Sequence, residues 1–321
     1  MRTEGRAPVC AIILPCYNEE AVLPATLSAM DGLLRDMVRE GLVAPESFAL
    51  YVDDGSTDAT WSLIAAARTE KGRPRVRGLK LAGNAGHQNA LLAGMEMAAE
   101  AADCAVTIDA DLQDDIAAIP EMIRHFQAGS HVVYGVRADR KADSWFKRTS
   151  ASLFYALMRL LGAPLVPGHA DFRLVSRFAL KALEDYPERD LFLRSVFPAM
   201  RLRSSAVRYA LKAREAGQTK YTLLKMVSFA VRGIALHSSA PLRLSGCLGL
   251  FSFFLAVLLT CSTLMAWSAG SVIPGWTSLA LIILYLGAIQ LFCLAVLGEY
   301  VAKIFTEVKG RPRYIAEEKL E

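Results

Sequence analysis

The sequence has 321 residues, of which 53% are apolar and 21% are charged, and its formal net charge is +4. This length allows a domain of about 230 residues beside a smaller module, and so weak a net charge gives no reason to expect nucleic acid as a partner. The six cysteines form no Cys-x-x-Cys pair, so reduced thiols in a cytoplasmic protein are the simplest interpretation.

The first half of the chain alternates short apolar runs with amphipathic segments. The apolar runs predict strands at residues 9–14, 48–52, 76–81, 104–108 and 131–136. The segments between them predict helices near residues 21–39, 58–68, 88–101 and 117–128. This alternation is typical of an α/β fold with a mostly parallel sheet covered on both faces. Ligands bind such sheets beyond the carboxyl ends of the strands.

Polar segments follow the first two predicted strands. The first is PCYNEE (residues 15–20), in which a proline ends the strand and acidic residues open the next helix, as the helix dipole favours. An ordinary strand-to-helix turn would explain this segment equally well on its own. The second is DDGSTD (residues 53–58), where Thr57 or Asp58 is suited to cap a helix. A cap does not need two adjacent carboxylates, so we predict that Asp53 hydrogen bonds to a base or a ribose hydroxyl.

The segment DADLQDD (residues 109–115) follows the fourth predicted strand and carries the strongest chemical signal. In an extended chain, residues two apart project to the same side, so Asp109, Asp111 and Gln113 would converge on one point. Clustered carboxylates repel one another unless a cation neutralises them, and hard oxygen ligands favour Mg²⁺ or Mn²⁺ with substrate phosphates completing the shell. An acidic surface loop is the alternative, but the position at the ligand-binding edge of the sheet favours a metal site.

No Asp, Glu, Lys or Arg occurs between Leu244 and Gly298. A break at residues 268–275 divides this tract into two apolar stretches, 244–267 and 276–298, each long enough to cross a bilayer as a helix. Basic residues flank the outer ends of the pair, which predicts that both ends are cytoplasmic and that the short loop lies outside. The alternative is a helical hairpin buried in a soluble core, although uncharged runs of this length are rare in soluble domains.

Taken in order, these segments resemble the family 2 glycosyltransferases, which have a GT-A fold. Later segments narrow the resemblance to polyisoprenyl-phosphate glycosyltransferases, the group around dolichol-phosphate mannose synthase and bacterial lipid-phosphate glucosyltransferases. The matching segments, which are spread over nearly the whole chain, are GNAGHQNA (83–90), DLQD (111–114), YGVR (134–137), FKR (146–148), ADFRL (170–174) and AGQTKY (216–221). The sequence departs from the family pattern at Asp115, where proline is common, and at residues 194–198.

The resemblance implies a role for each matching residue. The nucleotide would be bound by Pro15, Tyr17, Glu19, Asp53, Asn84 and Asp109. The divalent cation and the donor diphosphate would be held by Asp109, Asp111 and Gln113. The acceptor phosphate would be faced by Arg137, Arg148, Ser152, Arg214 and Lys220. The catalytic residues would be Asp171, Asp111, Arg137 and Arg148, with Asp171 at the position often discussed as a catalytic base.

A polyisoprenyl phosphate does not need a base to act as a nucleophile. The second pKa of a phosphate monoester is about 6, so the acceptor is largely a dianion at neutral pH. Such a dianion can attack the anomeric carbon without losing a proton, and a single in-line displacement would invert that carbon. The harder requirement is to bring two phosphorylated substrates together, which a metal on the leaving group and arginines on the nucleophile would meet. We therefore expect Asp171 to orient Arg173, a neighbouring arginine or the sugar.

The expected organisation is a cytoplasmic GT-A catalytic domain at residues 1–220, a juxtamembrane amphipathic helix at 221–242, two transmembrane helices within 243–299 and a charged cytoplasmic tail at 300–321. A second basic amphipathic helix is expected near residues 147–161. Helices of this kind suit the membrane interface, and core packing would explain the same patterns. The expected location is the inner or plasma membrane, with both termini cytoplasmic.

The predicted function is inverting transfer of a sugar, by resemblance from a UDP-sugar, to undecaprenyl or dolichyl phosphate. The sequence does not choose the sugar. The expected partners are the nucleotide-sugar donor, the lipid acceptor and the bilayer, with no nucleic acid. A homo-oligomer, a downstream flippase and a second glycosyltransferase are compatible with this function.

Three alternatives remain open. A processive polysaccharide synthase would share the early segments, but its Gln-x-x-Arg-Trp motif is absent from this sequence. A transferase to a hydroxyl-bearing lipid would need a base, and Asp171 could serve. A non-catalytic membrane scaffold or sugar-nucleotide sensor would not need the set of Asp109, Asp111 and Gln113.

Overall fold

The computed structural model describes residues 6–69, 75–137, 169–189, 191–210, 240–269 and 275–321. The chain divides into two compact units, and each is described by itself. The first unit comprises residues 1–156, 164–220 and 311–321, and the second comprises residues 157–163 and 221–310.

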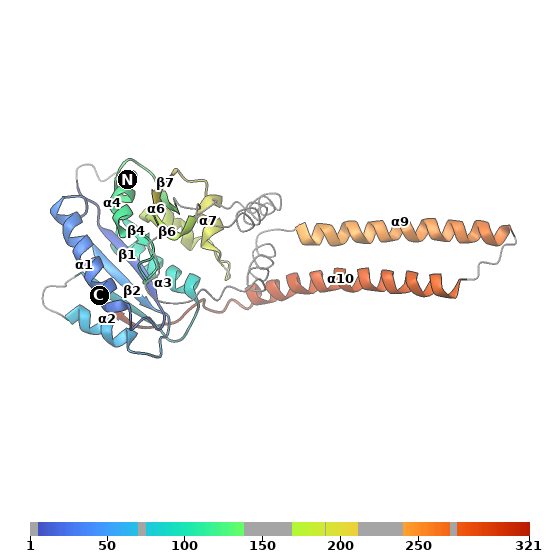
Figure 1. Cartoon of the computed structure of the whole chain (residues 1–321), viewed down its shortest axis with the longest axis horizontal. Coiled ribbons are helices and arrows are strands. Elements are labelled where there is room, and N and C mark those ends of the chain that lie inside the picture. Colours follow the sequence, from blue (N-terminus) through green and yellow to red (C-terminus); the bar gives the residue numbers. More distant parts are fainter. Residues whose placement is uncertain (1–5, 70–74, 138–168, 190, 211–239, 270–274) are drawn as a thin grey trace. The chain divides into compact units, whose positions relative to one another are not determined.

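The described part of the first unit is built on one eight-stranded sheet (Figure 1). Its strands, in order across the sheet, are β7 (Ser204–Tyr209), β5 (Val132–Arg137), β6 (His169–Ser176), β4 (Cys104–Thr107), β1 (Cys10–Cys16), β2 (Phe48–Asp53), β3 (Val76–Leu81) and β8 (Ala316–Leu320). Strands β6 and β8 run antiparallel to their neighbours, and the other neighbouring pairs are parallel. The carboxyl ends of β1, β2 and β4 therefore meet at one edge of the sheet.

Helices cover both faces of this sheet because alternate strand residues are apolar on each side. One face packs against α1 (Leu23–Arg39), α2 (Thr60–Thr69) and α4 (Ile119–Gln127), the last preceded by the short 3₁₀ helix η1 (Ile116–Ala118). The other face packs against α3 (His87–Ala101), α6 (Arg177–Glu184) and α7 (Leu193–Ala199). Along β1, Ile12 and Leu14 face the first layer, whereas Ala11 and Ile13 face the second.

The predicted α/β fold, a mostly parallel sheet with helices on both faces, is confirmed. Each of the five predicted strands and four predicted helices is present, with bounds within two residues of those expected. Strands β6, β7 and β8 and helices α6 and α7 were not among the predicted elements.

The end of the chain returns to the sheet of the first unit. Residues 316–320, expected only as part of a charged tail, form β8 and pair antiparallel with β3. Several side-chain contacts hold this segment in place. The Tyr314 hydroxyl donates to Glu96 of α3, Trp61 Nε1 donates to Glu318 at 3.1 Å, and Lys80 lies 3.0 Å from Glu317. The C-terminal strand is therefore a structural part of the first unit and covers the edge of β3.

The described part of the second unit consists of two long helices, α9 (Ala240–Ser268) and α10 (Trp276–Val308). The windows Leu244–Ser262 and Tyr285–Val308 have mean hydropathies of 2.2 and 1.6, and none of their residues is buried. By length and composition, both helices could cross a membrane. A hairpin buried in a soluble core is not what the described residues show.

Candidate functional site

A cavity of about 310 Å³ lies at the edge where β1, β2 and β4 end. It is lined by residues that follow four consecutive strands of the chain: Pro15, Cys16, Tyr17, Glu19, Asp54, Asn84, Gly86, His87, Ala90, Asp109, Ala110 and Asp111. A larger hollow of about 630 Å³ lies between α9 and α10, but its lining is mostly apolar and offers little chemistry for a charged donor. The smaller, polar cavity is therefore the candidate active site.

The loops after β1 and β2 are tied together at Asn18. Its backbone N–H donates to Ser56 Oγ at 2.9 Å, and its Oδ1 accepts from the backbone N–H of Thr57 at 2.9 Å. Asn18 adopts a positive φ of 54°, which asparagine tolerates better than most residues. Tyr17 is left 47% exposed on the cavity wall, where an aromatic ring is suited to stack against a nucleotide base.

The two adjacent carboxylates after β2 have different surroundings. Asp54 accepts hydrogen bonds from the backbone N–H groups of Ala85 at 2.7 Å and Gly86 at 3.0 Å, just before α3. These amides, which could otherwise bind a substrate phosphate, are therefore already satisfied by Asp54. Asp53 is fully buried, and its Oδ1 accepts from the backbone N–H of Ser56 at 3.2 Å. Its Oδ2 has no hydrogen-bond partner within the described residues, and burial raises the pKa of both carboxyl groups.

The loop after β2 requires glycine at position 55. Gly55 has a φ of +70°, and a Cβ there would lie 2.5 Å from the carbonyl carbon of Gly83. We expect Gly55→Ala to lower stability by about 3 kcal/mol, because it combines backbone strain with a backbone clash. This corresponds to a drop of roughly 6–12 °C in Tm, measured by thermal unfolding of the full-length protein in detergent.

The matched control is Gly83→Ala, on the other side of the same contact. A Cβ at Gly83 meets no atom of the described residues within 4 Å, so this variant is expected to stay within roughly 1 kcal/mol of the wild type. Equal losses in the two variants would contradict the close approach of the two loops.

The acidic loop after β4 is not extended, so the geometric premise of the sequence prediction is wrong. Residues 110–111 form a turn, and Leu112 has a φ of 52°. The turn places Asp109 and Asp111 on the cavity wall, whereas Gln113 is not among its lining residues. The backbone N–H of Gln113 donates to Asp111 Oδ1 at 3.2 Å, and its Nε2 is buried without a partner in the described part of the chain.

The donor set of this loop fits a divalent cation shared with a substrate. In the described part of the chain, no three His, Cys, Asp or Glu side chains are grouped closely enough to hold a metal by themselves. Mg²⁺ does not need such a cage, because it is usually held by one or two carboxylates and by substrate phosphates. Burial raises the pKa of Asp109, and Asp171, Asp114 and Asp111 raise it further by repulsion, which a bound cation would relieve.

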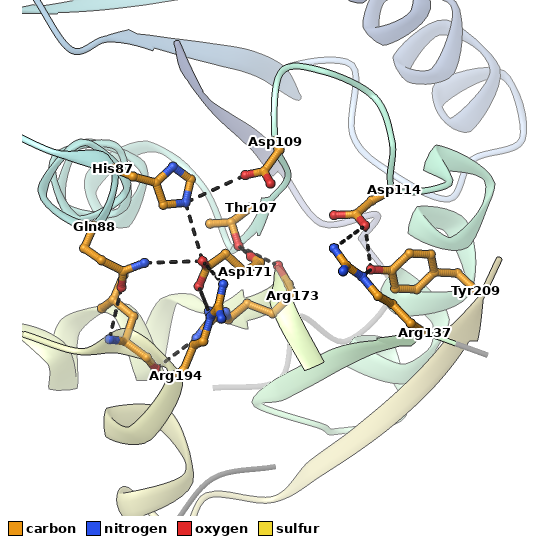
Figure 2. Close-up of polar contacts among 11 residues, drawn as sticks. His87, Gln88, Thr107, Asp109, Asp114, Arg137, Asp171, Arg173, Arg194 and Tyr209 are labelled. Atoms are coloured by element: carbon orange, nitrogen blue, oxygen red, sulfur yellow. Dashed lines mark hydrogen bonds and ion pairs between the residues drawn. The ribbon is translucent and has the colours of Figure 1, made fainter. Parts of the chain in front are cut away.

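Asp171, near the start of β6, lies at the centre of a buried ion-pair cluster (Figure 2). It accepts from the fully buried guanidinium of Arg173. Arg194 of α7 binds both carboxylate oxygens, with its Nε 3.2 Å from Oδ1 and its Nη2 2.8 Å from Oδ2. Gln88 donates to Oδ2 at 3.3 Å, and His87 Nε2 lies 3.5 Å from the same oxygen. Both carboxylate oxygens are thus engaged by side chains of the protein.

The charges of this cluster keep Asp171 ionised. Burial alone would raise the pKa of Asp171, but the hydrogen bond to His87 and the charges of Arg173 and Arg194 hold it well below its usual range. Burial likewise lowers the pKa of His87, but Asp171 and Asp109 outweigh that effect and raise it. One carboxylate thus faces two guanidinium groups, and the surplus positive charge suits a site that binds phosphates.

A second polar cluster lies at the last residue of β5 (Figure 2). The Tyr209 hydroxyl donates to Asp114 Oδ1 at 2.6 Å and accepts from Arg137 Nε at 3.3 Å. Arg137 Nη2 lies 3.6 Å from Asp114 Oδ1. The Asp114 and Tyr209 side chains are buried, whereas 40% of the Arg137 side chain is exposed.

The predicted site residues separate into three groups. The cavity brings together Pro15, Tyr17, Glu19, Asn84, Asp109 and Asp111. Asp53, Gln113, Asp171 and Arg137 belong to the same sheet edge or its loops but are not among the residues that line the cavity. Arg148, Ser152, Arg214 and Lys220 lie outside the described residues. So do the predicted amphipathic helix near residues 147–161 and residues 221–239 of the predicted juxtamembrane helix, whose last three residues begin α9. The roles given to all of these residues stay predictions.

Four residues that organise the site are not among the predicted site residues: Asp54, Gln88, Arg194 and Tyr209. Asp54 is one of two adjacent carboxylates in the DDGSTD segment, of which the sequence prediction assigns only Asp53 to the ligand. Gln88 lies in the segment GNAGHQNA (83–90), which resembles the family, and Arg194 begins residues 194–198, which depart from the family pattern. Tyr209 gave no chemical signal, since an aromatic residue at the end of a strand is ordinary.

Comparison with known proteins shows similarity over nearly the whole chain. The model of the family described as "Glycosyl transferase family 2" matches residues 11–184. The uncharacterized glycosyltransferase YkoT of Bacillus subtilis is 46% identical, over 96% of this chain and 90% of its own length. The SfII prophage-derived bactoprenol glucosyl transferase of Shigella flexneri is 35% identical, over 95% of this chain and 96% of its own. Among solved structures, a mannosyltransferase of Pyrobaculum calidifontis in complex with GDP-Man and Mn²⁺ is similar with 16% identity and a TM-score of 0.45, over 94% of this chain and 89% of that one.

Proposed function

Because this chain belongs to glycosyltransferase family 2, we propose that it transfers a sugar from a nucleotide-diphosphate sugar to a polyisoprenyl phosphate. The similarity to a bactoprenol glucosyl transferase over 95% of the chain supports a lipid phosphate as the acceptor. Within the site, the strongest support for the proposal is the ion pairing of the Asp171 carboxylate. Its carboxylate is bound by two arginines and its pKa is held well below the usual range, so it is a poor proton acceptor. An acceptor whose attacking oxygen is already anionic needs no general base.

The acceptor phosphate is itself the nucleophile in this proposal. One of its oxygens attacks the anomeric carbon, and the bond from that carbon to the nucleotide's terminal phosphate oxygen breaks as the new bond forms. The nucleoside diphosphate leaves with the electron pair, and the anomeric carbon is inverted. No proton has to move, because a phosphate monoester with a second pKa of about 6 is largely dianionic at neutral pH.

A lipid with a hydroxyl acceptor is the less favoured alternative. A hydroxyl nucleophile needs a general base within hydrogen-bond reach whose pKa lies near the working pH. Asp171 is the residue that the sequence offers for that role. Both of its oxygens are occupied by Arg194, and the depressed pKa weakens it as a base.

The donor would bind in the cavity after β1, β2 and β4. Tyr17 and Asn84 line it together with Pro15 and Glu19, and Asp53 lies at the end of the adjacent strand. Asp109 and Asp111, with Gln113 beside them, would hold Mg²⁺ or Mn²⁺, which when bound would neutralise charge on the leaving diphosphate. His87 opens α3 on the same wall, where its Nε2 lies 3.7 Å from Asp109 Oδ1.

Among the described residues, the acceptor phosphate would be bound by Arg137, beside Asp114 of the acidic loop. Arg137 is half-exposed at the end of β5 and is held by Asp114 and Tyr209. Arginine is suited to this role because its planar fork donates two parallel hydrogen bonds to a phosphate. Arg148, Ser152, Arg214 and Lys220 complete the proposed set by resemblance.

We propose that α9 and α10 anchor the protein in the inner or plasma membrane. Both contain a long apolar window with no buried residue. Positive residues follow α10, which favours cytoplasmic outer ends and a catalytic unit on the cytoplasmic side. Two spans would keep the active site on the membrane surface that carries the polyisoprenyl phosphate.

The test is an assay of the purified full-length protein in detergent with undecaprenyl phosphate, Mg²⁺ or Mn²⁺ and a panel of UDP- and GDP-sugars. We expect one donor to give a lipid-linked monophosphate sugar with an equal amount of nucleoside diphosphate, and a UDP-sugar is the preferred donor. Chelation of the metal should stop the reaction, and added Mn²⁺ should restore it. The absence of product from every donor would reject the proposed function.

A further inference from the structure

Tyr209 is the last residue of β7, an edge strand whose only described neighbour is β5. The two strands are parallel, and the register places Tyr209 directly beside Arg137. Tyr209 is 4% exposed, and its ring meets Phe172 edge-on with centroids 5.1 Å apart. The hydroxyl is therefore delivered to a fixed point by a rigid strand and a packed ring.

At that point the hydroxyl makes two hydrogen bonds of opposite direction. It donates to Asp114 at 2.6 Å and accepts from Arg137 Nε at 3.3 Å. A phenol can do both at once, whereas a carboxylate only accepts and a guanidinium only donates. Tyr209 thus links the last residue of β5 to the acidic loop that carries the proposed metal ligands (Figure 2).

These contacts leave most N–H donors of the Arg137 guanidinium able to bind a phosphate. A guanidinium has five N–H donors, and the described contacts engage Nε directly, with Nη2 at the longer distance of 3.6 Å from Asp114. With 40% of its side chain exposed, Arg137 can still present donors to a phosphate. Among the described residues, loss of the Tyr209 hydroxyl would take from Asp114 its closest donor and leave it facing Arg137.

We propose that Tyr209 is a positioning residue for the acceptor phosphate, because it satisfies Asp114 and holds Arg137 by Nε so that the rest of the guanidinium faces the acceptor. This inference rests on the proposed function, which assigns the acceptor phosphate to Arg137. Loss of the hydroxyl lets Arg137 turn towards Asp114, and the acceptor then competes with a buried carboxylate for the same donors.

The variant Tyr209→Phe tests this proposal, because phenylalanine keeps the ring and its contact with Phe172. We expect kcat/KM for undecaprenyl phosphate to fall roughly tenfold, the effect of one hydrogen bond to a charged group, while the KM of the donor stays within twofold. Tyr186→Phe is the matched control: this tyrosine is half-buried on the other face of the sheet, and both constants should stay unchanged.

A double-mutant cycle with Arg137→Ala separates positioning from general stability. If Tyr209 acts through Arg137, Tyr209→Phe should change kcat/KM for the acceptor less than twofold when Arg137 is already absent. A tenfold loss in both backgrounds, no loss in the wild-type background, or an equal loss for donor and acceptor would overturn the proposal. Thermal unfolding of all four proteins identifies any variant that is merely unstable.

Binding of farnesyl phosphate to the same full-length proteins, measured by calorimetry in detergent, distinguishes failure of this inference from failure of the proposed function. If the wild type binds farnesyl phosphate but transfers no sugar to undecaprenyl phosphate, the proposed function fails, and the binding constants of the cycle decide the role of Tyr209. We expect Tyr209→Phe to weaken the binding of farnesyl phosphate roughly tenfold in the wild type. Added to Arg137→Ala, the same substitution should weaken binding no further than Arg137→Ala alone. A wild type that does not bind the probe, or a Kd unchanged by Tyr209→Phe, would overturn the positioning role.

Discussion

Replacing Asp111 by Asn is expected to lower kcat/KM for the donor roughly 10³-fold, which corresponds to about 4 kcal/mol of transition-state stabilisation. Asn keeps the size of the side chain but removes one of the two carboxylates of the DADLQDD loop that line the cavity. A cation shared with the diphosphate would then be held by one charge less. Initial rates measured over a range of Mn²⁺ and Mg²⁺ concentrations should show a higher metal requirement as well as a lower maximal rate.

The control for this loss is Asp115→Asn, four residues along the same loop. Asp115 caps η1 by accepting from the backbone N–H of Ala117 at 3.3 Å, and asparagine caps a helix about as well. We expect the control to stay within roughly 0.5 kcal/mol of the wild type in stability and activity. Full activity in Asp111→Asn, or an equal loss in both variants, would contradict a specific role for the cavity carboxylates.

Replacing Asp171 by Asn is expected to destabilise the protein more than any other single change in the site. The substitution leaves Arg173 fully buried without its carboxylate, and breaking a buried ion pair from one side costs about 3–5 kcal/mol. Tm should fall on the order of 10 °C. At a temperature where the variant is still folded, activity should fall only about tenfold, because the phosphate acceptor needs no base.

Two further variants sharpen this test. Adding Arg173→Met to Asp171→Asn removes the stranded charge and should recover at least half of the lost Tm. Asp103→Asn is the matched control, since Asp103 pairs with Arg177 at 3.6 Å at the opposite end of β4, and it should change stability by less than about 1 kcal/mol. Near-complete loss of activity in Asp171→Asn with an unchanged Tm would instead identify Asp171 as a base.

The pH dependence of activity tests the same point independently. The pKa of Asp171 in the folded protein lies well below the ordinary value of 3.8, so its ion pairs stabilise the fold above about pH 4 and are lost only as the pH falls through the depressed pKa. Activity between about pH 6 and pH 9 should therefore show no step from this carboxyl group. A rise in kcat with an apparent pKa near 7 that disappears in Asp171→Asn would contradict this assignment.

The regular part of the fold could be predicted because its strands are apolar on both faces and its helices have one apolar stripe. Strand β6 was not predicted because Asp171 and Arg173 interrupt its apolar pattern. They are buried in a central strand only because they neutralise each other, and a pairing of this kind is invisible to periodicity. Strand β8 was not predicted because its sequence, AEEKL, is mostly charged, as suits an exposed strand at the edge of a sheet.

The candidate site could be located from sequence, but its geometry could not. Polar segments after three strands marked the correct edge of the sheet, since parallel strands end together. The turn at residues 110–111 depends on a positive φ at Leu112, which nothing in the residue type favours. Arg173 lies on the same strand as Asp171 and is an expected partner. The partners Gln88 and Arg194 come from α3 and α7, far from Asp171 in the sequence, so only the tertiary structure identifies them.

The most direct measurement compares undecaprenyl phosphate with undecaprenol as acceptors for one nucleotide-sugar donor, in the presence of Mn²⁺ and the full-length protein. We predict that only the phosphate is glycosylated, that its ³¹P resonance changes from a monoester to a diester, and that the anomeric configuration of the sugar is inverted relative to the donor. Glycosylation of undecaprenol at a similar rate, or a product whose phosphate is still a monoester, would contradict a phosphate nucleophile.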